Sequence, residues 1–176
     1  MLEWVEVERR AAGVKLLLLD CDGVLTDGRI TPVPGGDELK SFHTHDGHGL
    51  VMLHRAGIRS GIISGRTSLL VEMRAADLGV TYVRQGALDK LSVFDALLIE
   101  SAVEPSQIAY VGDDVVDIPL MRRCGLALAV ADATPDTRDA AHYVTRLNGG
   151  HGAVREVCEL ILKAQGRWDE LMERYR

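Results

Sequence analysis

A run of four leucines that ends in two aspartates is the feature that most constrains this chain of 176 residues. Leu16–Leu19 is apolar at every position, which is typical of a strand buried on both faces of a parallel sheet. Asp20 and Asp22 follow it directly. Side chains two residues apart in an extended chain point to the same side, so both carboxylates can face one site at the carboxyl end of the strand. Two acids held together there require a cation or a shared proton.

Apolar runs alternate with helical patterns along the rest of the chain. This alternation predicts an α/β fold, in which helices cover both faces of a three-layer, doubly wound and mostly parallel sheet. The length suits a single domain over residues 1–176. We expect strands at 14–19, 58–63, 80–83, 108–111, 126–130 and 142–144. We expect helices at 2–12, 46–55, 68–78, 87–101, 115–124, 135–140 and 154–168.

A β-hairpin is predicted at about residues 28–42, as an insertion after the first strand. Two prolines and two glycines there lie between extended segments, which is the pattern of a hairpin turn. Gly79 is expected to end the helix that precedes it, because glycine readily takes the left-handed conformation of a helix C-cap. The chain is expected to close with a helix and tail over about 153–176.

Composition narrows the classes of partner and the compartment. The formal net charge of -6 disfavours a nucleic acid or an anionic membrane as partner. No apolar run approaches the length of a membrane span, and residues 1–13 are charged, unlike a signal peptide. The three cysteines are widely spaced without a Cys-x-x-Cys pair, which indicates reduced thiols rather than disulfides. We therefore expect a cytoplasmic protein.

Three more polar signals follow predicted strands or begin predicted helices. Ser64 opens a Ser-Gly-Arg turn after the second strand, a place that suits an anion. Lys90 lies early in a helix, and Asp113 belongs to the stretch Gly-Asp-Asp-Val-Val-Asp after the fourth strand. If the strands are parallel, these side chains meet Asp20 and Asp22 at one edge of the sheet. Such a set has the parts needed to transfer a phosphoryl group with a magnesium ion.

In this order the motifs resemble those of the haloacid dehalogenase superfamily of aspartate-nucleophile phosphatases. The resemblance implies that family's Rossmann-like sheet. It implies that Asp20 attacks phosphorus and forms an aspartyl-phosphate, and that Asp22 protonates the leaving alkoxide and then deprotonates water. Ser64 and Lys90 would hold the phosphoryl oxygens, and Lys90 would also keep Asp20 ionised. The motifs that carry the resemblance are Asp20-Cys21-Asp22-Gly23-Val24, Ser64, Lys90 and Gly112-Asp113-Asp114-Val115-Val116-Asp117.

The same resemblance implies Mg²⁺ as the cofactor. The ion would lie on the carboxylates of Asp20 and Asp113 and on the backbone carbonyl of Asp22. Asp114 and Asp117 are expected to orient the metal site and its loop rather than touch the substrate.

The spacing of the motifs leaves no room for the cap domain of larger superfamily members. The capless branch that the chain resembles, from about residue 9 to 165, is the 3-deoxy-D-manno-octulosonate 8-phosphate phosphatase family of lipopolysaccharide synthesis. The resemblance implies a homotetramer with central hairpins, in which neighbouring subunits cover each site. It rests on Leu25-Thr26-Asp27-Gly28, Glu38-Leu39-Lys40-Ser41-Phe42, Asp46-Gly47, Ser64-Gly65-Arg66, His142-Tyr143-Val144-Thr145 and Gly149-Gly150-His151-Gly152-Ala153-Val154-Arg155-Glu156-Val157.

The implied substrate is a phosphorylated sugar acid, so a cationic contact for its carboxylate is expected beside the phosphate site. Histidine at position 45 departs from the family, whose members often have arginine or lysine there, and histidine is only partly charged at neutral pH. The resemblance implies that the residues that contact the substrate are Asp22, His43, Thr44, His45, Asp46, Gly47, Arg66, Arg74 and Lys90.

Other interpretations stay open at this stage. A sialic-acid-type 9-phosphate is the nearest competing substrate, because the same branch includes such enzymes. A phospho-receiver also uses clustered aspartates, a lysine and Mg²⁺, and a silent assembly protein could keep the hairpin alone. His43, His45 and His48 could form a zinc site. The segment Gly149–Gly152 is either a flexible turn or a gate, and Cys21 is expected to point into the core.

Overall fold

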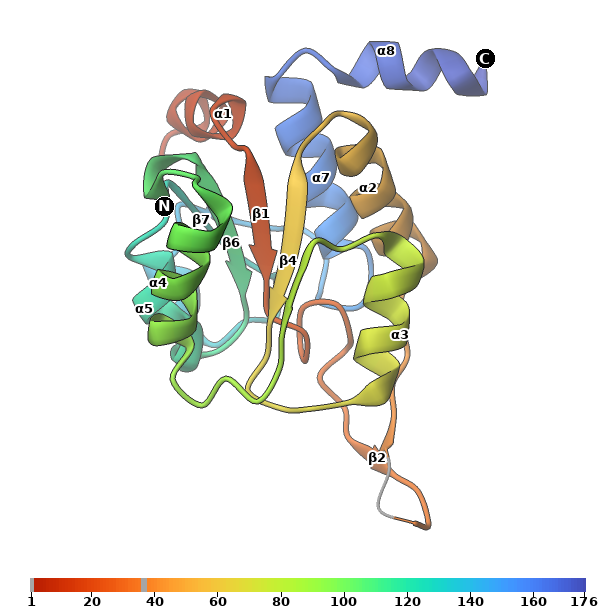
Figure 1. Ribbon diagram of the computed structural model, residues 1–176. Coiled ribbons are helices and arrows are strands. Elements are labelled where there is room, and N and C mark those ends of the chain that lie inside the picture. Colours follow the sequence, from red (N-terminus) through yellow and green to blue (C-terminus); the bar gives the residue numbers. More distant parts are fainter. Residues whose placement is uncertain (1, 36–37) are drawn as a thin grey trace.

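The four-leucine strand lies inside the sheet, as the sequence predicts. The computed structural model describes residues 2–35 and 38–176. Six strands form a parallel sheet in the order β5-β4-β1-β6-β7-β8, so that β1 is hydrogen-bonded on both edges (Figure 1). The strands are β1 Leu16–Leu19, β4 Arg59–Ile63, β5 Tyr82–Arg84, β6 Ile108–Gly112, β7 Leu126–Ala129 and β8 Tyr143–Val144.

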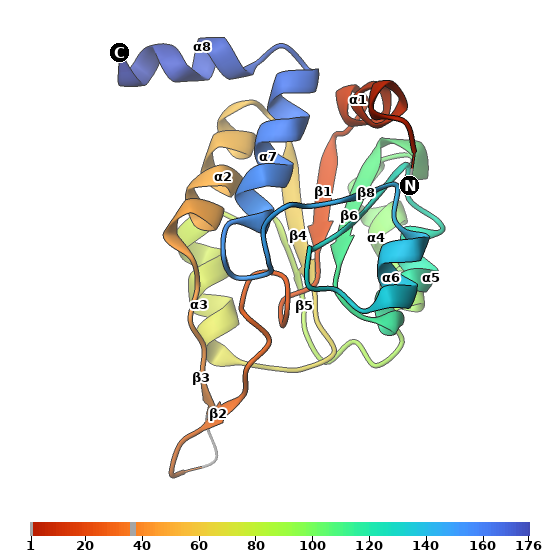
Figure 2. The same cartoon turned by 180° about the vertical axis from the view of Figure 1, so that it is seen from behind.

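Helices cover both faces of this sheet, which confirms the three-layer, doubly wound fold (Figures 1 and 2). One layer holds α1 Trp4–Ala12, α2 Thr44–Arg55, α3 Leu69–Leu78 and α7 Ala153–Ala164. The other holds α4 Lys90–Ser101, α5 Ile118–Met121 and α6 Pro135–Ala140. The short helix α8 Trp168–Met172 follows α7. Among the described residues, no helix is both long and apolar enough to cross a membrane.

Several predicted helices have different bounds in the structure. The helix predicted at 115–124 is divided into a 3₁₀ turn, Val115–Asp117, and α5, because the Asp117 side chain folds inward and bonds the turn. The helix predicted at 154–168 ends with α7 at Ala164, before Gly166, which has a φ of 65°. Gly79 ends α3 in the left-handed conformation with a φ of 71°, as expected.

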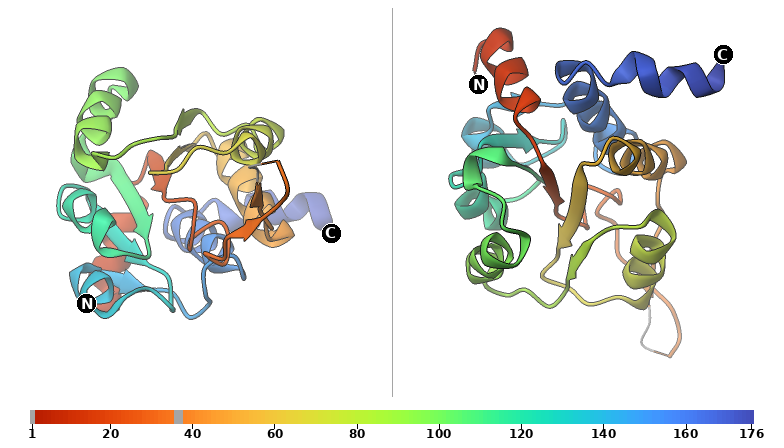
Figure 3. Two further views of the ribbon diagram at one scale, coloured as in Figure 1. Left: turned by 90° about the horizontal axis from the view of Figure 1, so that it is seen from below. Right: turned by 45° about the horizontal axis from the view of Figure 1, so that its top comes forward.

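The hairpin after β1 is confirmed by two antiparallel strands, β2 Thr31–Pro32 and β3 Glu38–Leu39. It extends from the edge of the sheet at which the strands end (Figures 1 and 3). Between β1 and α2, the described residues form only this hairpin as regular structure and no cap domain. The predicted turn includes residues 36 and 37, which lie outside the described residues.

Helices α2 and α7 pack closely, and a buried carboxylate joins them. A β-carbon at Gly49 would lie 3.2 Å from the Cα of Arg155, so glycine permits the close approach. Asp46 is 1% exposed, and its carboxylate accepts hydrogen bonds from the backbone N–H groups of Gly152 at 3.1 Å and Arg155 at 2.7 Å. These N–H groups begin α7, so Asp46 supplies that helix with an N-terminal cap.

The structure gives Asp46 this capping role, and its contact with substrate stays a prediction. Both of its carboxylate oxygens are used inside the protein, and burial raises the pKa of the group above its ordinary value. Gly47 has a structural role too, since a β-carbon there would lie 2.3 Å from the Arg74 guanidinium. These positions in α2 hold neighbouring helices in place.

Asp46→Ala is expected to lower the free energy of unfolding by about 2–3 kcal/mol, because two buried N–H groups lose their acceptor. Urea unfolding monitored by circular dichroism measures the change. The exposed Asp77 in α3 provides the control, and Asp77→Ala should stay within about 0.5 kcal/mol of the wild type. A loss as small for Asp46→Ala would contradict this account of α7 capping.

Candidate active site

The strand ends bring the predicted acids, hydroxyl and ammonium into one cavity of about 630 Å³. Asp20 and Asp22 follow β1, Ser64 follows β4, Asp113 follows β6, and Lys90 begins α4. The left view of Figure 3 looks from below toward the edge at which these loops gather. Parallel pairing of β1 with both β4 and β6 therefore accounts for the convergence that the sequence predicts. Arg66 and Asp114 also line this cavity.

A buried ammonium joins two carboxylates at the base of the cavity. The Nζ of Lys90 lies 2.9 Å from Asp20 Oδ1 and 2.8 Å from Asp117 Oδ1. The Asp20 carboxylate also accepts a hydrogen bond from the Cys21 N–H at 2.7 Å. Burial and the nearby Asp117 raise the pKa of Asp20 to about 6, although Lys90 opposes this rise. The carboxylates in turn raise the pKa of Lys90 despite its burial, which keeps the lysine charged.

Asp117 organises the second acidic loop, as expected, and has more partners than the sequence indicates. Its Oδ2 accepts hydrogen bonds from the N–H groups of Asp113 at 3.0 Å and Asp114 at 3.4 Å. Its Oδ1 accepts one from the Tyr110 hydroxyl at 2.7 Å, in addition to Lys90. Tyr110 was not foreseen, because a tyrosine inside an apolar strand has no sequence signature that separates it from the core. Asp114 is exposed and caps the 3₁₀ turn, which agrees with an orienting role.

The acids form a group suited to a hard divalent cation. One oxygen from each of Asp20, Asp113 and Asp117 lies within 4.8 Å of the others. Asp113 Oδ1 is buried and has no hydrogen-bond partner among the described residues. Burial, followed by the nearby Asp20 and Asp117, raises the pKa of Asp113 to about 7. Three carboxylates facing one ammonium leave two negative charges, and carboxylate oxygens are the ligands that Mg²⁺ prefers. The residues present therefore fit magnesium.

Glycines allow the loops around this group to meet. Gly23 has a φ of 86°, and a β-carbon there would lie 2.1 Å from Asp113 Oδ2. Gly149 approaches so closely that its β-carbon would lie 1.7 Å from the Gly23 carbonyl oxygen. Gly150 donates a backbone hydrogen bond to the Val24 carbonyl at 2.9 Å. The Gly149–Gly152 segment is therefore packed against the loop that carries Asp22, rather than being only a flexible turn.

Ser64 lies in the turn between β4 and α3, at the edge of the cavity. Its side chain is buried at the end of β4, and its hydroxyl accepts a hydrogen bond from the Arg66 N–H at 3.3 Å. The hydroxyl thus stabilises the turn and lines the cavity at the same time. A phosphoryl oxygen placed above Asp20 would find Ser64 and Lys90 as donors.

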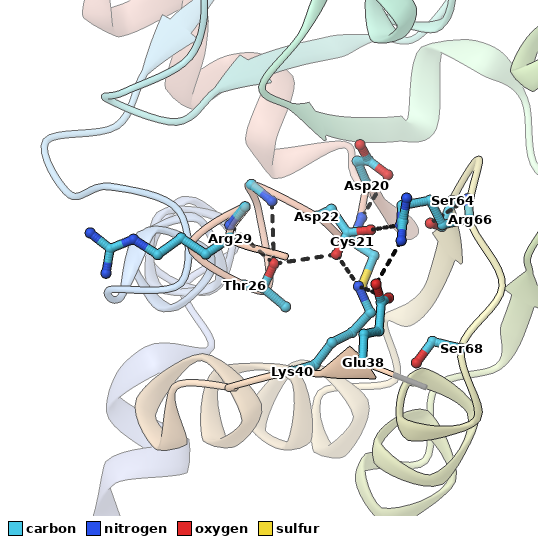
Figure 4. A network of polar contacts seen from close by, with 12 residues as sticks. Asp20, Cys21, Asp22, Thr26, Arg29, Glu38, Lys40, Ser64, Arg66 and Ser68 are labelled. Carbon is cyan, nitrogen blue, oxygen red and sulfur yellow. Dashed lines mark hydrogen bonds and ion pairs between the residues drawn. The ribbon is translucent and has the colours of Figure 1, made fainter. Parts of the chain in front are cut away.

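Asp22 lies in a network that includes two hairpin residues (Figure 4). Lys40 and Arg66 both pair with Asp22, and Arg66 Nη2 bonds Glu38 Oε2 at 2.6 Å. Lys40 Nζ also lies 3.0 Å from Glu38 Oε1. Lys40 and Glu38 belong to a hairpin segment that resembles the family, but no role is predicted for either of them from the sequence. The contact between Asp22 and Lys40 spans 18 residues and a hairpin, so no local pattern could reveal it.

Other residues expected at the substrate lie elsewhere within a single chain. His43 and His45 line a second cavity of about 790 Å³, beside α7. Arg74 packs over Gly47, and Thr44 is exposed at the start of α2. Within one described chain these side chains lie apart from the cavity of Asp22, because the start of α2 lies beside α7. Their contact with substrate stays a prediction.

The zinc interpretation gains no support from the described residues. The His43 and His45 rings lie 5.0 Å apart, but His48 turns to the Tyr175 hydroxyl at 2.9 Å. The only group of at least three potential metal ligands among the described residues is the aspartate group at the sheet edge. Cys21 is fully buried, as expected, and burial raises its pKa to about 12.

Comparison with known proteins agrees with the geometry. Residues 70–157 match the model of the haloacid dehalogenase-like hydrolase family. The 3-deoxy-D-manno-octulosonate 8-phosphate phosphatase of Escherichia coli K12 is 49% identical over 165 residues, which cover 94% of this chain and 88% of that protein. The Yersinia pestis enzyme of the same name is 49% identical over 162 residues, with 92% and 87% coverage.

Solved structures give the same result. The crystal structure of 3-deoxy-D-manno-octulosonate 8-phosphate phosphatase from Moraxella catarrhalis, in complex with a magnesium ion, a phosphate ion and a KDO molecule, has a TM-score of 0.96. It is 40% identical, and the match covers 99% of this chain and 100% of that chain. Likeness of this extent, together with the aspartates at the strand ends, shows that the chain belongs to the 3-deoxy-D-manno-octulosonate 8-phosphate phosphatase family of haloacid dehalogenase-like hydrolases.

Proposed function

We propose that this chain is a Mg²⁺-dependent phosphomonoesterase that hydrolyses 3-deoxy-D-manno-octulosonate 8-phosphate to the free keto-sugar acid and phosphate. The observation that carries the proposal is the buried group of Asp20, Asp113 and Asp117 around Lys90. The substrate follows from relatives at 49% identity and from the structural neighbour that holds magnesium, phosphate and KDO. These relatives are phosphatases, which favours hydrolysis over a phospho-receiver or a silent assembly protein.

In the proposed reaction the Asp20 carboxylate is the nucleophile. It forms a bond to phosphorus while the bond from phosphorus to the sugar oxygen breaks, and the electron pair stays on that oxygen. Asp22 donates a proton to the oxygen, which leaves as the alcohol. Asp22 then takes a proton from water as the water attacks phosphorus, which releases phosphate and restores Asp20. Magnesium, when bound, balances the charge of the carboxylates and the phosphoryl oxygens.

Other side chains in the cavity hold the substrate in this proposal. Ser64 and Lys90 donate to the phosphoryl oxygens, and Lys90 also keeps Asp20 ionised. Arg66 is half exposed beside Asp22 and supplies the cation for the sugar carboxylate. The Asp22 backbone carbonyl completes the metal ligands, and Asp117 holds the Asp113 loop in place.

The assembly and the setting belong to the same proposal. A homotetramer built on the hairpins is supported by the exposed apolar side chains of Ile30 and Leu39 on the hairpin, which are 55% and 58% exposed. Neighbouring subunits would cover the otherwise open cavity and could bring His43, Thr44 or His45 near a partner's substrate. We also propose that each chain forms one catalytic domain. The protein would act in the cytoplasm, in lipopolysaccharide synthesis. The net charge of -6 disfavours binding to a nucleic acid.

A panel of phosphorylated sugars tests the substrate. Octulosonate 8-phosphate should give the highest kcat/KM, above sialic-acid-type 9-phosphates and hexose phosphates, because Arg66 offers a cation for the carboxylate. Phosphate release with Mg²⁺ measures the rates. A higher kcat/KM for a sialic-acid-type 9-phosphate would support the competing substrate. That substrate is included because position 45 is histidine, where family members often have arginine or lysine. Absence of any phosphomonoesterase activity would overturn the proposed function.

Asp20→Asn should lower kcat by at least ~10³-fold, because an amide is a poor nucleophile toward phosphorus. The change leaves the side-chain size unchanged, and circular dichroism checks the fold. Asp77→Asn, an exposed change of the same type in α3, should keep wild-type kcat. An Asp20→Asn variant with near wild-type activity would assign the nucleophile to another residue.

Magnesium should raise the melting temperature more at about pH 8 than at about pH 5. Asp20 and Asp113 have folded-state pKa values of about 6 and about 7, both above their ordinary value of 3.8. Between pH 3.8 and about pH 7, the metal-free folded chain therefore binds more protons than the unfolded chain. Its free energy of unfolding falls as the pH rises through 6 and 7. The cation replaces those protons, and its effect is largest where they are lost.

Differential scanning fluorimetry with and without MgCl₂ measures this difference. Asp113→Asn should remove most of the magnesium-induced shift at about pH 8, because it removes one of the three grouped carboxylates. Equal shifts at both pH values would contradict the assignment of these aspartates to the metal.

A further inference from the structure

Lys40 is a buried cation that enters the active site from the hairpin. It follows β3 directly, and its side chain is only 3% exposed. Its ammonium donates to Asp22 Oδ1 and lies 3.0 Å from Glu38 Oε1 (Figure 4). A lysine removed from water to this extent is unfavourable unless its charge is compensated. Its placement between two carboxylates therefore needs an explanation beyond surface charge pairing.

The two oxygens of the Asp22 carboxylate have different surroundings. Oδ1 accepts from Lys40 and lies 3.5 Å from the Thr26 hydroxyl. Oδ2 lies 3.7 Å from Arg66 Nε, and no group among the described residues donates a hydrogen bond to it. One oxygen is thus held, while the other is left for a partner from outside the chain.

Glu38 anchors both cations that face Asp22. Its Oε1 forms an ion pair with Lys40, and its Oε2 pairs with Arg66 Nη2 at 2.6 Å. Asp22, Lys40, Glu38 and Arg66 therefore form a closed ring of charges that joins the hairpin to the loops after β1 and β4. Such a ring restricts the rotation of the Asp22 side chain. A single pair with one flexible lysine would leave that rotation free.

We infer that Lys40 is a positioning residue for Asp22: it holds Oδ1 so that Oδ2 presents its proton to the oxygen of the leaving alcohol. The inference rests on the proposed function, and it adds a role for a residue outside the four motifs. As the phosphorus–oxygen bond breaks, its electron pair passes to the leaving oxygen, and the proton on Oδ2 moves to that oxygen. The electrons of the O–H bond stay on Asp22 as a carboxylate, which Lys40 faces.

Dependence on the leaving group separates this role from others. A sugar alkoxide is a poor leaving group and needs the Asp22 proton, whereas p-nitrophenol leaves as a stable phenolate with little need for one. Loss of Lys40 should therefore slow hydrolysis of the sugar phosphate and spare p-nitrophenyl phosphate. Because a misplaced group can cost ~10²-fold in rate, the difference is large enough to measure.

The experiment compares wild type, Lys40→Met and Lys40→Gln as purified full chains with Mg²⁺. The substrates are p-nitrophenyl phosphate and the sugar phosphate that the wild type hydrolyses fastest in the panel. We expect the first-turnover rate of alcohol release to fall by at least ~30-fold for the sugar phosphate in either variant, and by less than ~5-fold for p-nitrophenyl phosphate. This step is measured because the later hydrolysis of the phosphoenzyme, which also uses Asp22, is common to both substrates. Lys40→Gln decides the result if Lys40→Met does not fold. Lys15→Met, an exposed lysine before β1, is the matched control and should match the wild type.

Two results would overturn the inference. Equal loss of the first-turnover rate on both substrates would assign Lys40 to folding or to general phosphate binding. A first-turnover rate for the sugar phosphate that is unchanged at saturation but needs more substrate to saturate would make Lys40 a substrate contact instead. Failure of the proposed function is seen separately, since it appears in the wild type as the wrong order of substrates in the panel.

Discussion

The structure depends on the repulsion among three carboxylates gathered at the ends of β1 and β6. Asp20 and Asp117 pair with the buried ammonium of Lys90, and an oxygen of Asp113 lies within 4.8 Å of theirs. Such a group is unfavourable in a folded protein unless a cation or protons compensate its charge. Burial, together with this crowding, raises the pKa values of Asp20 and Asp113. A fold that keeps this group is therefore built around a ligand that carries positive charge.

The packing around this group leaves little freedom for other residues. A β-carbon at Gly112 would lie 2.5 Å from the Asp117 side chain, so glycine allows Asp117 to fold back over its own loop. Gly23 does the same for Asp113. The hairpin contributes Lys40 and Glu38 to the opposite side of the site, beside Asp22. The hairpin on which the proposed oligomer would be built thus also contacts Asp22, so assembly would affect the placement of Asp22.

Local patterns in the sequence are sufficient for much of this architecture. The leucine strand, the Asp-x-Asp pair and the second acidic stretch follow from apolar runs and residue spacing, and parallel pairing then gathers Asp20, Ser64 and Lys90. Contacts between distant elements could not be found in this way. Asp46 resembles a substrate contact in the sequence but caps α7, a helix that begins more than a hundred residues later. Lys40 depends in the same way on how the hairpin folds back.

If Asp20 is the nucleophile, it carries the phosphoryl group during turnover, and mass spectrometry of the acid-quenched chain detects that group. The chain is mixed with octulosonate 8-phosphate and Mg²⁺, quenched within the first turnovers and digested at low pH. One phosphoryl group is expected on the peptide that contains Asp20, and none on that peptide after the substrate is exhausted. Rapid turnover with phosphate on another residue, or with no phosphorylated peptide at any quench time, would contradict this assignment of the nucleophile.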